Sequence, residues 1–309
     1  MEDKIYEAYE SFCAISKVPV INCLPEPLDF HKKYVHRSTP VIVKNGWNQL
    51  LEQTGVRDGL THDTLKDDET SLIDVSVTPN GWADAIGKLD INKNPENHKS
   101  NKTTKSEIFL LPEQTSMTFP ELYQKLSTQT KTSSKFYYYQ KQNSSLTIEC
   151  DNLLKSNKVP ASVPFADKAF ENLDAINIWL GSSESVSSIH KDPYENIYCV
   201  VEGKKKFSIA PPVLMPWMDF KDVDVYKHKL DGENWGVECQ NYKTQWIDGF
   251  DESKVKLMNV AVEKGDLFYL PAFWFHQVEQ DDFTLAVNYW YDYDFLNPGY
   301  LLIDALSPK

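Results

Sequence analysis

The stretch 187-SSIHKDPYENIYCVVEGKKKF-207 holds a candidate metal-binding pair, an apolar strand, a glycine and three lysines. His190 and Asp192 stand two positions apart. Residues with this spacing in an extended strand point to the same side, so both can reach one metal ion. The competing interpretation is a polar loop, a buried strand and a basic turn. Because an H-x-D triplet is common by chance, the rest of the chain has to decide between the two.

A third metal ligand has to come from elsewhere in the chain, which has seven histidines. The one in an aromatic, strand-like context is His276, within 271-PAFWFHQ-277. Two histidines and one carboxylate on one face of the ion are typical of non-haem Fe(II) oxygenases, which keep the other face open. A single core histidine is more often just a hydrogen-bonded side chain, so the triad needs further support.

The segment 265-GDLFYLPAFWFH-276 supplies part of that support. A glycine turns the chain, a strand follows, Pro271 breaks it, and the next strand starts with His276. This order of residues resembles the second motif of cupin proteins. The segment departs from the motif at Phe273, where the motif prefers a glycine.

Lys205 is the second supporting residue. It follows Gly203, which we expect to turn the chain into a hairpin next to the strand of the metal ligands. A lysine that reaches back into a barrel can hold the far carboxylate of a dicarboxylate cosubstrate as a compact point charge. Taken alone, Lys204, Lys205 and Lys206 would more simply form an exposed basic turn.

Composition narrows the classes of function. Lys and Arg number 32 against 45 Asp and Glu, which gives a net charge of −13 in 309 residues. No long basic face is available to meet phosphates, so we expect no direct nucleic-acid binding. An acidic surface suits a cationic partner segment, although the same charge also serves solubility alone.

The cysteines and the N-terminus bear on the compartment. The five cysteines are scattered and form no C-x-x-C pair, which argues against a structural zinc site and favours a reducing compartment. The N-terminal sequence MEDKIYEAYESF lacks the apolar core of a signal peptide, and no run approaches the about 18 apolar residues of a membrane span. We expect a cytoplasmic protein, with the nucleus as an alternative, and no membrane contact.

Strand signals dominate the second half of the chain. Short strands separated by Gly and Pro turns favour a mainly β fold, a barrel or jelly roll with flanking helices. We divide the chain into an N-terminal helix and strand region at 1–130, which packs on the barrel, and a catalytic core at 131–309. Strands are expected at 41–43, 71–81, 135–142, 175–181, 195–203, 206–212, 255–265, 266–280 and 283–292, helices at 4–16, 119–128 and 296–306, and an exposed loop at 88–107.

Together these features resemble the JmjC family of Fe(II)- and 2-oxoglutarate-dependent oxygenases, nearly from end to end. The resemblance is closest to the small hydroxylase branch, which includes the lysyl hydroxylase of the developmentally regulated GTP-binding proteins. It implies a double-stranded β-helix, the cupin-like form of the jelly roll. The residues that carry it are 75-VSVTPNGWADA-85, 138-YYQKQN-143, 177-NIWLG-181, 189-IHKDPYENIYCVVEGKKKF-207, 268-FYLPAFWFHQV-278 and 286-AVNYWYD-292.

The resemblance also implies roles for individual residues. His190, Asp192 and His276 match the iron ligands, and Lys205 matches the lysine that pairs with the C5 carboxylate of 2-oxoglutarate. The residues expected to complete the cosubstrate site are Tyr139 and Ser187 at that carboxylate, Asn196 and Asn288 near the C1 carboxylate, and Trp290 as a wall. For Tyr139 the alternative is core packing, and for the asparagines it is a satisfied buried amide.

The implied reaction uses Fe(II), 2-oxoglutarate and O2 to hydroxylate a carbon of a lysine side chain in a protein, with a developmentally regulated GTP-binding protein as the expected partner. The branch resemblance, the acidic charge and the lack of chromatin-reading modules favour this over demethylation of histones or other methylated proteins. Cleavage of methylated histone tails is the weaker alternative, because no residue is placed to activate a nucleophile. A scaffold that only binds partners is disfavoured by the intact ligand set. The resemblance also suggests a homodimer formed through the terminal helices.

Overall fold

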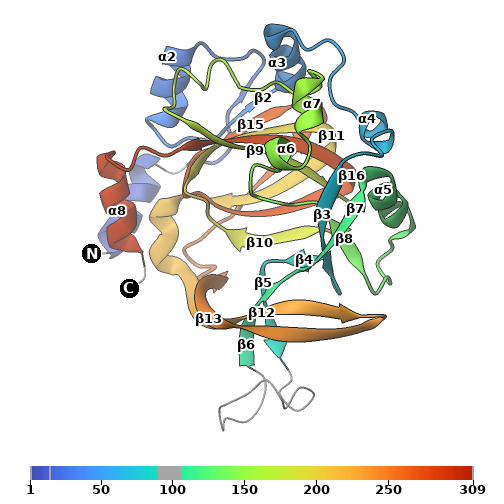
Figure 1. The fold of residues 1–309 in the computed structure, drawn as a ribbon. Helices are drawn as coiled ribbons and strands as arrows, with labels where there is room; N and C mark the ends of the chain where they lie inside the picture. The colour runs from blue at the N-terminus through green and yellow to red at the C-terminus, as the bar shows by residue number, and fades with distance from the viewer. Residues whose placement is uncertain (1, 14, 90–105, 308–309) are drawn as a thin grey trace.

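The protein is represented by a computed structural model, which describes residues 2–13, 15–89 and 106–307. It is a jelly roll with helices on its outside (Figure 1). The predicted fold class is therefore confirmed. Most of the predicted loop at 88–107 lies outside the described residues, and its two ends are the ends of strands.

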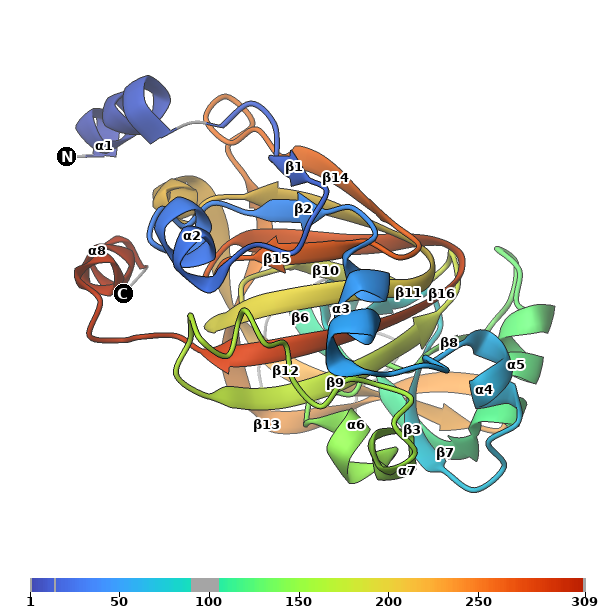
Figure 2. The ribbon, with the colours of Figure 1, turned by 90° about the horizontal axis from the view of Figure 1, so that it is seen from above.

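The central sheet runs in the order β1-β2-β15-β11-β16-β10-β4, with β14 paired to β11 and β9 paired to β16. The two long strands β11 and β16 pair with each other antiparallel along most of their length, and shorter strands pair on either side of them (Figure 2). The strands are β1 (Val20–Ile21), β2 (Val41–Val43), β4 (Trp82–Ala83), β9 (Leu173–Gly181), β10 (Val186–His190), β11 (Tyr194–Ala210), β14 (Met258–Glu263), β15 (Leu267–Leu270) and β16 (Phe275–Asp292).

Strand β11 does not turn at Gly203, so the predicted hairpin is wrong. The register between β11 and β16 shifts between Val200 and Glu202 and again between Glu202 and Lys204, which marks a bulge around Gly203, and the strand continues. Gly203 has φ +81°, and a Cβ there would lie 2.5 Å from the carbonyl oxygen of Phe283, so only glycine fits this bend. Opposite it, the hydroxyl of Thr284 bonds to both the N–H and the carbonyl oxygen of Lys204 at 3.2 Å.

A second sheet has the order β13-β12-β6-β5. Its strands are β5 (Ala85–Leu89), β6 (Ser106–Leu111), β12 (Met218–Asp231) and β13 (Asn234–Phe250). The long β12–β13 hairpin lies along the lower edge of the molecule in Figure 1. We predicted no strand between residues 213 and 254. The outward-facing positions of this hairpin carry many charged side chains, so its sequence lacks the strong apolar alternation of a core strand.

A third sheet, β7-β3-β8, connects the N-terminal region to the barrel. It consists of β3 (Leu72–Thr78), β7 (Glu113–Thr118) and β8 (Phe136–Tyr138), and helix α5 (Phe119–Thr128) follows directly on β7. Helix α5 begins where predicted because Thr118 and Glu121 form a capping box.

The remaining helices cover the outside of the sheets. The α-helices are α1 (Glu2–Ala8), α2 (Pro27–Phe30), α3 (Gly46–Thr54), α4 (His62–Lys66), α6 (Ser145–Ile148), α7 (Asp151–Lys155) and α8 (Pro298–Leu306). Two π-helical turns, η1 (Tyr9–Cys13) and η2 (His31–Val35), extend α1 and α2, and η5 (Pro212–Trp217) is a 3-10 helix. Both termini lie on the same side of the molecule, where side chains of α1 and α8 pack near η5 (Figure 1). Within the described residues, no helix is long and apolar enough to cross a bilayer.

The main hydrophobic core includes side chains from both halves of the chain. Leu50 and Phe119 belong to the same buried cluster as Ile178 and Tyr289. Strand β2 also pairs with β15, so the N-terminal region adds a strand to the central sheet. The division at residue 130 stays a prediction.

Candidate functional site

The three predicted metal ligands come together at the end of the barrel. His190 is the last residue of β10 and lies directly opposite His276 of β16 in the antiparallel register. Asp192 lies just beyond the end of β10, in the connection to β11. Oδ2 of Asp192 is 3.7 Å from Nε2 of His190 and 3.5 Å from Nε2 of His276. One ligand atom from each residue falls within 4.8 Å of the others, which is close enough to share one ion.

Backbone hydrogen bonds orient both imidazoles. Nδ1 of His190 is 2.7 Å from the carbonyl oxygen of Ser188, and Nδ1 of His276 is 2.9 Å from that of Trp274. A carbonyl oxygen can only accept, so each Nδ1 carries the proton and each Nε2 keeps its lone pair. In metal sites, a hydrogen bond to the far ring nitrogen fixes the tautomer of a ligand histidine in this way.

The loop before β16 holds Asp192 in position. The N–H of Phe273 donates to the carbonyl oxygen of Asp192 at 2.8 Å. The buried carboxylate of Glu195 in turn accepts from the N–H of Ala272 at 3.2 Å and from the hydroxyl of Tyr269 at 2.7 Å. Burial raises the pKa of Glu195 to about 7 against these two donors. This network connects the segments that carry Asp192 and His276.

The departure from the cupin motif at Phe273 has a physical explanation. Phe273 has φ +63°, a conformation that a glycine adopts without strain and a bulky residue adopts rarely. Its ring packs edge-on against Tyr293 with the centroids 5.0 Å apart, and Nζ of Lys191 lies 5.6 Å from the ring centroid. Aromatic and cation–π contacts thus offset the backbone strain.

The electrostatics of the triad suit a cation. Burial lowers the pKa of His190, and the neighbouring His276 lowers it further, so His190 stays neutral and can ligate. Burial by itself would raise the pKa of Asp192, but the two imidazoles and Lys191 outweigh it, and the net shift is downward. Asp192 is therefore an anion, with the neutral imidazole of His190 beside it.

A narrow chamber lies beside the triad, and we call the part of it at Tyr138, which is hydrogen-bonded to Lys205, its closed end. Lys205 is 1% exposed, and its ammonium donates to the hydroxyl of Tyr138 at 3.0 Å. Ser187, whose hydroxyl also hydrogen-bonds Tyr138, lines the chamber together with Tyr138. Burial lowers the pKa of Lys205 to about 7. Among the described residues, no carboxylate lies within ion-pair distance to oppose this shift.

Tyr139, predicted to hold the cosubstrate carboxylate, lies outside this chamber. Its ring is fully buried in the main core, and its hydroxyl donates to Glu149 at 3.0 Å. Tyr138, one position earlier, is the tyrosine at the chamber. Successive side chains of a strand point to opposite faces, so an error of one residue moves the hydroxyl from the chamber to the core.

The remaining predicted residues line the chamber as expected. The amide of Asn288 donates to Oδ1 of Asn196 at 3.1 Å and accepts from Nε1 of Trp179 at 2.9 Å. Trp290 stacks on Tyr194 with the rings 5.0 Å apart, and its buried Nε1 has no hydrogen-bond partner among the described residues. Both asparagines and Trp290 line the same free space as His190, Asp192 and His276.

Outward from the triad, the chamber opens into a cavity of about 610 Å³. One wall comes from the β12–β13 hairpin and β6, where Trp246 packs on Phe109 with the ring centroids 4.5 Å apart. Trp246 also stacks on His190 at 6.2 Å, almost parallel. Neither this wall nor the neighbouring Asp84 was expected at the site from the sequence. The motif 75-VSVTPNGWADA-85 contained Asp84, but nothing in it showed which way the carboxylate points.

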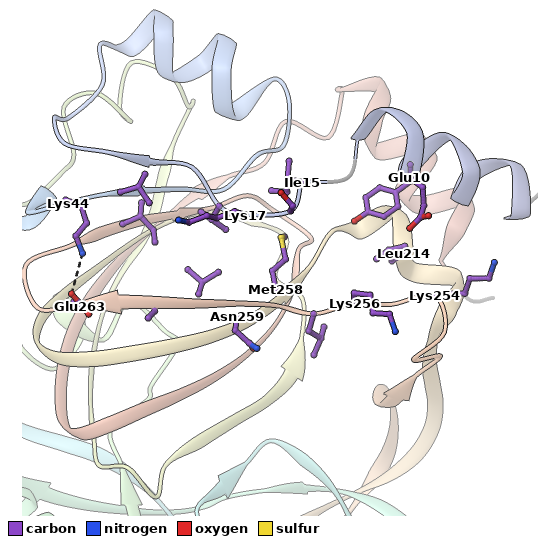
Figure 3. A pocket seen from close by; sticks show the side chains of 18 residues that line it. Glu10, Ile15, Lys17, Lys44, Leu214, Lys254, Lys256, Met258, Asn259 and Glu263 are labelled. Carbon is purple, nitrogen blue, oxygen red and sulfur yellow. Dashed lines mark ion pairs between the residues drawn. The ribbon is translucent and has the colours of Figure 1, made fainter.

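A larger hollow, about 770 Å³, lies between the N-terminal segment and β14 (Figure 3). Lys17 and Lys256 lie along it, and Lys44 forms an ion pair with Glu263 at 3.5 Å. None of the predicted site residues lines this hollow. The chemistry of the side chains, and not the size of the cavity, locates the candidate active site.

The comparisons with known proteins agree with this geometry. The model of the cupin-like domain family matches residues 27–297. JmjC domain-containing protein E of Dictyostelium discoideum is 32% identical, over 94% of this chain and 88% of the relative. The human bifunctional peptidase and (3S)-lysyl hydroxylase JMJD7 is 29% identical, over 97% and 92% of the two chains. Lysine-specific demethylase JMJ32 of Arabidopsis thaliana is 28% identical, over 91% and 83%.

Proposed function

The chain belongs to the JmjC family of cupin-like oxygenases, and from this premise we propose that it hydroxylates a carbon of a lysine side chain in a protein. The observation that carries the proposal is the convergence of His190, Asp192 and His276 next to a chamber with a buried lysine at its closed end. Members of this family use Fe(II) and 2-oxoglutarate.

The triad fits Fe(II). It offers two imidazole nitrogens and one carboxylate close to a shared point, with no cysteine thiolate among them. That donor set suits non-haem iron and leaves the other coordination positions open. His190, Asp192 and His276 would hold the ion.

The chamber fits the two ends of 2-oxoglutarate. Lys205 is a buried cation without a counter-charge, and with Tyr138 and Ser187 it offers a carboxylate three polar groups at the closed end. Nearer the triad, Asn196, Asn288 and the unpaired Nε1 of Trp290 would meet the other end. The free space is only about 30 Å³, room for one or two water molecules, so we expect the side chains to move apart on binding.

Iron and cosubstrate, when bound, supply the oxidising power that replaces a C–H bond with C–OH, using O2 and releasing succinate and CO2. The chain itself positions the reactants. The β10–β16 pairing fixes the triad, the closed end of the chamber holds the diacid, and the aromatic wall of Trp246 and Phe109 narrows the access of water.

The lysine substrate is supported by the similarity to the human lysyl hydroxylase and by the charge of −13, which suits a cationic partner segment. We propose a developmentally regulated GTP-binding protein as the partner. The test is to incubate the pure protein with Fe(II), 2-oxoglutarate and such a GTPase, and to search by mass spectrometry for a lysine heavier by one oxygen atom. No oxygen insertion and no turnover of 2-oxoglutarate would refute the proposal.

The second candidate function is demethylation of a methylated lysine, which the similarity to the Arabidopsis demethylase favours. Both reactions would use the same triad, since hydroxylation of an N-methyl group releases formaldehyde. Measuring formaldehyde from methyl-lysine peptides, alongside oxygen insertion into unmethylated ones, separates the two activities. A histone-tail peptidase is less well supported, because no nucleophile with an activating base lies in the cavity among the described residues.

Assembly and location remain proposals. Leu296 is 92% exposed and Leu301 70% exposed, so the C-terminal segment around α8 offers apolar surface for a second copy of the chain. Light scattering on the wild type and on Leu301→Glu would test a homodimer. We propose residence in the cytoplasm, with the nucleus as the alternative, to be checked by imaging of the tagged protein.

A further inference from the structure

Asp84 is a carboxylate at the outer cavity in an unusual backbone conformation. It follows Ala83 of β4, which pairs in parallel with Ser187 of β10. Asp84 has φ +53°, and its carbonyl oxygen accepts from the hydroxyl of Ser188 at 2.5 Å. Backbone strain of this kind persists only where the surrounding structure holds it. The pairing of Ala83 with Ser187 and the hydrogen bond from Ser188 thus hold Asp84 to the strand that carries His190.

The same serine connects Asp84 to the aromatic wall. The hydroxyl of Ser188 accepts from Nε1 of Trp246 at 3.1 Å while it donates to the carbonyl oxygen of Asp84. Asp84, Trp246 and Phe109 line one cavity with His190 and Asp192. An aliphatic stem lying along the aromatic rings would therefore have His190, Asp192 and the carboxylate of Asp84 within the same cavity.

The carboxylate of Asp84 has no cationic partner among the described residues. Its one side-chain hydrogen bond comes from the amide of Gln140 at 3.3 Å. Of the lysines that line the cavity, Lys141 is paired with Asp74 at 2.5 Å and Lys227 with Glu113 at 2.9 Å. Lys191 lies over the ring of Phe273. Burial without a counter-charge raises the pKa of Asp84 to about 6, so an arriving cation would favour its ionised form.

We propose that Asp84 is a specificity-determining residue, which receives the ammonium group of the substrate lysine while the stem of that lysine lies along Trp246 and Phe109. This inference rests on the proposed lysyl hydroxylation and adds the residue that selects the side chain. An ammonium with N–H groups can donate charge-assisted hydrogen bonds to the carboxylate, and a trimethylated one cannot. The site therefore favours unmethylated lysine.

The experiment measures binding, so it does not depend on turnover. The full chain is loaded with Mn(II) and N-oxalylglycine, an inert analogue of 2-oxoglutarate, and titrated with lysine-bearing peptides of the GTPase. Matched peptides carry norleucine or trimethyl-lysine in place of lysine. We expect the wild type to prefer lysine by about 10-fold or more, the value of a hydrogen bond between charged groups.

Asp84→Asn is the test variant, because asparagine tolerates positive φ and keeps the size of the side chain. We expect it to lose the preference for lysine. The matched control is Asp282→Asn, at an exposed aspartate with φ +50°, which should keep the preference. A preference retained by Asp84→Asn, a wild type that binds norleucine as well as lysine, or no binding of the lysine peptides at all would overturn the inference.

The proposed function is judged separately. Failure of the wild type to turn over 2-oxoglutarate and insert oxygen refutes hydroxylation, whatever the peptides bind. If the wild type hydroxylates lysine and Asp84→Asn does so with an unchanged KM for the peptide, hydroxylation stands and the role of Asp84 falls.

Discussion

The closed and open ends of the candidate active site each contain one ionisable side chain without a group of opposite charge as its partner. At the closed end, Lys205 has a tyrosine hydroxyl as its partner; at the open end, Asp84 has an amide. The buried Asp266, by contrast, is paired with Lys44 at 2.6 Å. A buried charge without a counter-charge lowers stability, so its retention points to a ligand of opposite sign. The comparison suggests a diacid at one end and a cationic side chain at the other.

We expect the largest effect from removing a ligand of the metal triad, which lies between the two ends. His190→Ala or Asp192→Ala should reduce turnover of 2-oxoglutarate below detection, because the iron loses one of three protein ligands. The measurement is metal content by mass spectrometry together with succinate production. His31→Ala, at an exposed histidine outside the triad, is the matched control and should behave as the wild type. Full activity in either triad variant would contradict the assignment of the metal site.

The second-largest expected effect comes from a substitution at the closed end alone. Lys205→Met should weaken the binding of 2-oxoglutarate by about 2–3 kcal/mol, roughly 30- to 150-fold, because a charge-assisted pair is lost. The same change should stabilise the ligand-free protein, since it removes a buried amine that has no counter-charge. Calorimetric titration and denaturant unfolding measure the two quantities. The control is Lys206→Met, at an exposed lysine that pairs with Asp281; equal effects of both variants would count against a special role for Lys205.

Two adjacent tyrosines sharpen the description of the closed end. Tyr138→Phe removes the hydroxyl beside Lys205 and should weaken the binding of 2-oxoglutarate by about 10-fold. Tyr139→Phe removes a hydroxyl that bonds Glu149 in the core, so it should cost about 1 kcal/mol of stability and leave the affinity unchanged. The opposite pattern would restore Tyr139 as the cosubstrate residue.

The smallest effect is on the pH dependence of stability in the ligand-free protein. The pKa of Asp84 is raised to about 6, so between about pH 4 and 6 the folded state binds more protons than the unfolded state, and stability falls as pH rises. The pKa of Lys205 is lowered to about 7, so between about pH 7 and 10 the unfolded state binds more, and stability rises with pH.

Thermal unfolding across this range measures both slopes. Asp84→Asn should reduce only the acid-side slope, and Lys205→Met only the alkaline one. The other charged groups that line the cavity near Asp84 are Lys141, Lys191, Lys227, His190 and Asp192; they are the same in the wild type and in both variants. A single variant that flattened both slopes would show that the two ends do not act independently.

The sequence predicted the elements whose signals are local. Helix α5 follows from its capping box, and the triad follows from two short motifs in which the spacing of ligands is written directly. The β12–β13 hairpin was missed because its strands have a solvated face, although Asp231-Gly232 at its turn is a hairpin signal. The tyrosine error has a similar cause. In 137-YYY-139 every position carries the same side chain, so alternation cannot show which one faces inward.

By itself, the sequence determined the family, the jelly-roll class and the three candidate metal ligands, because these depend on residue types at fixed local spacing. Only the tertiary structure decided that Tyr138 and not Tyr139 lies beside Lys205, that β11 bends through a bulge at Gly203, and that the hairpin brings Trp246 to the cavity near Asp84. These features depend on strand register and on contacts between distant segments. A shift of one residue reverses the face of a strand without changing its composition.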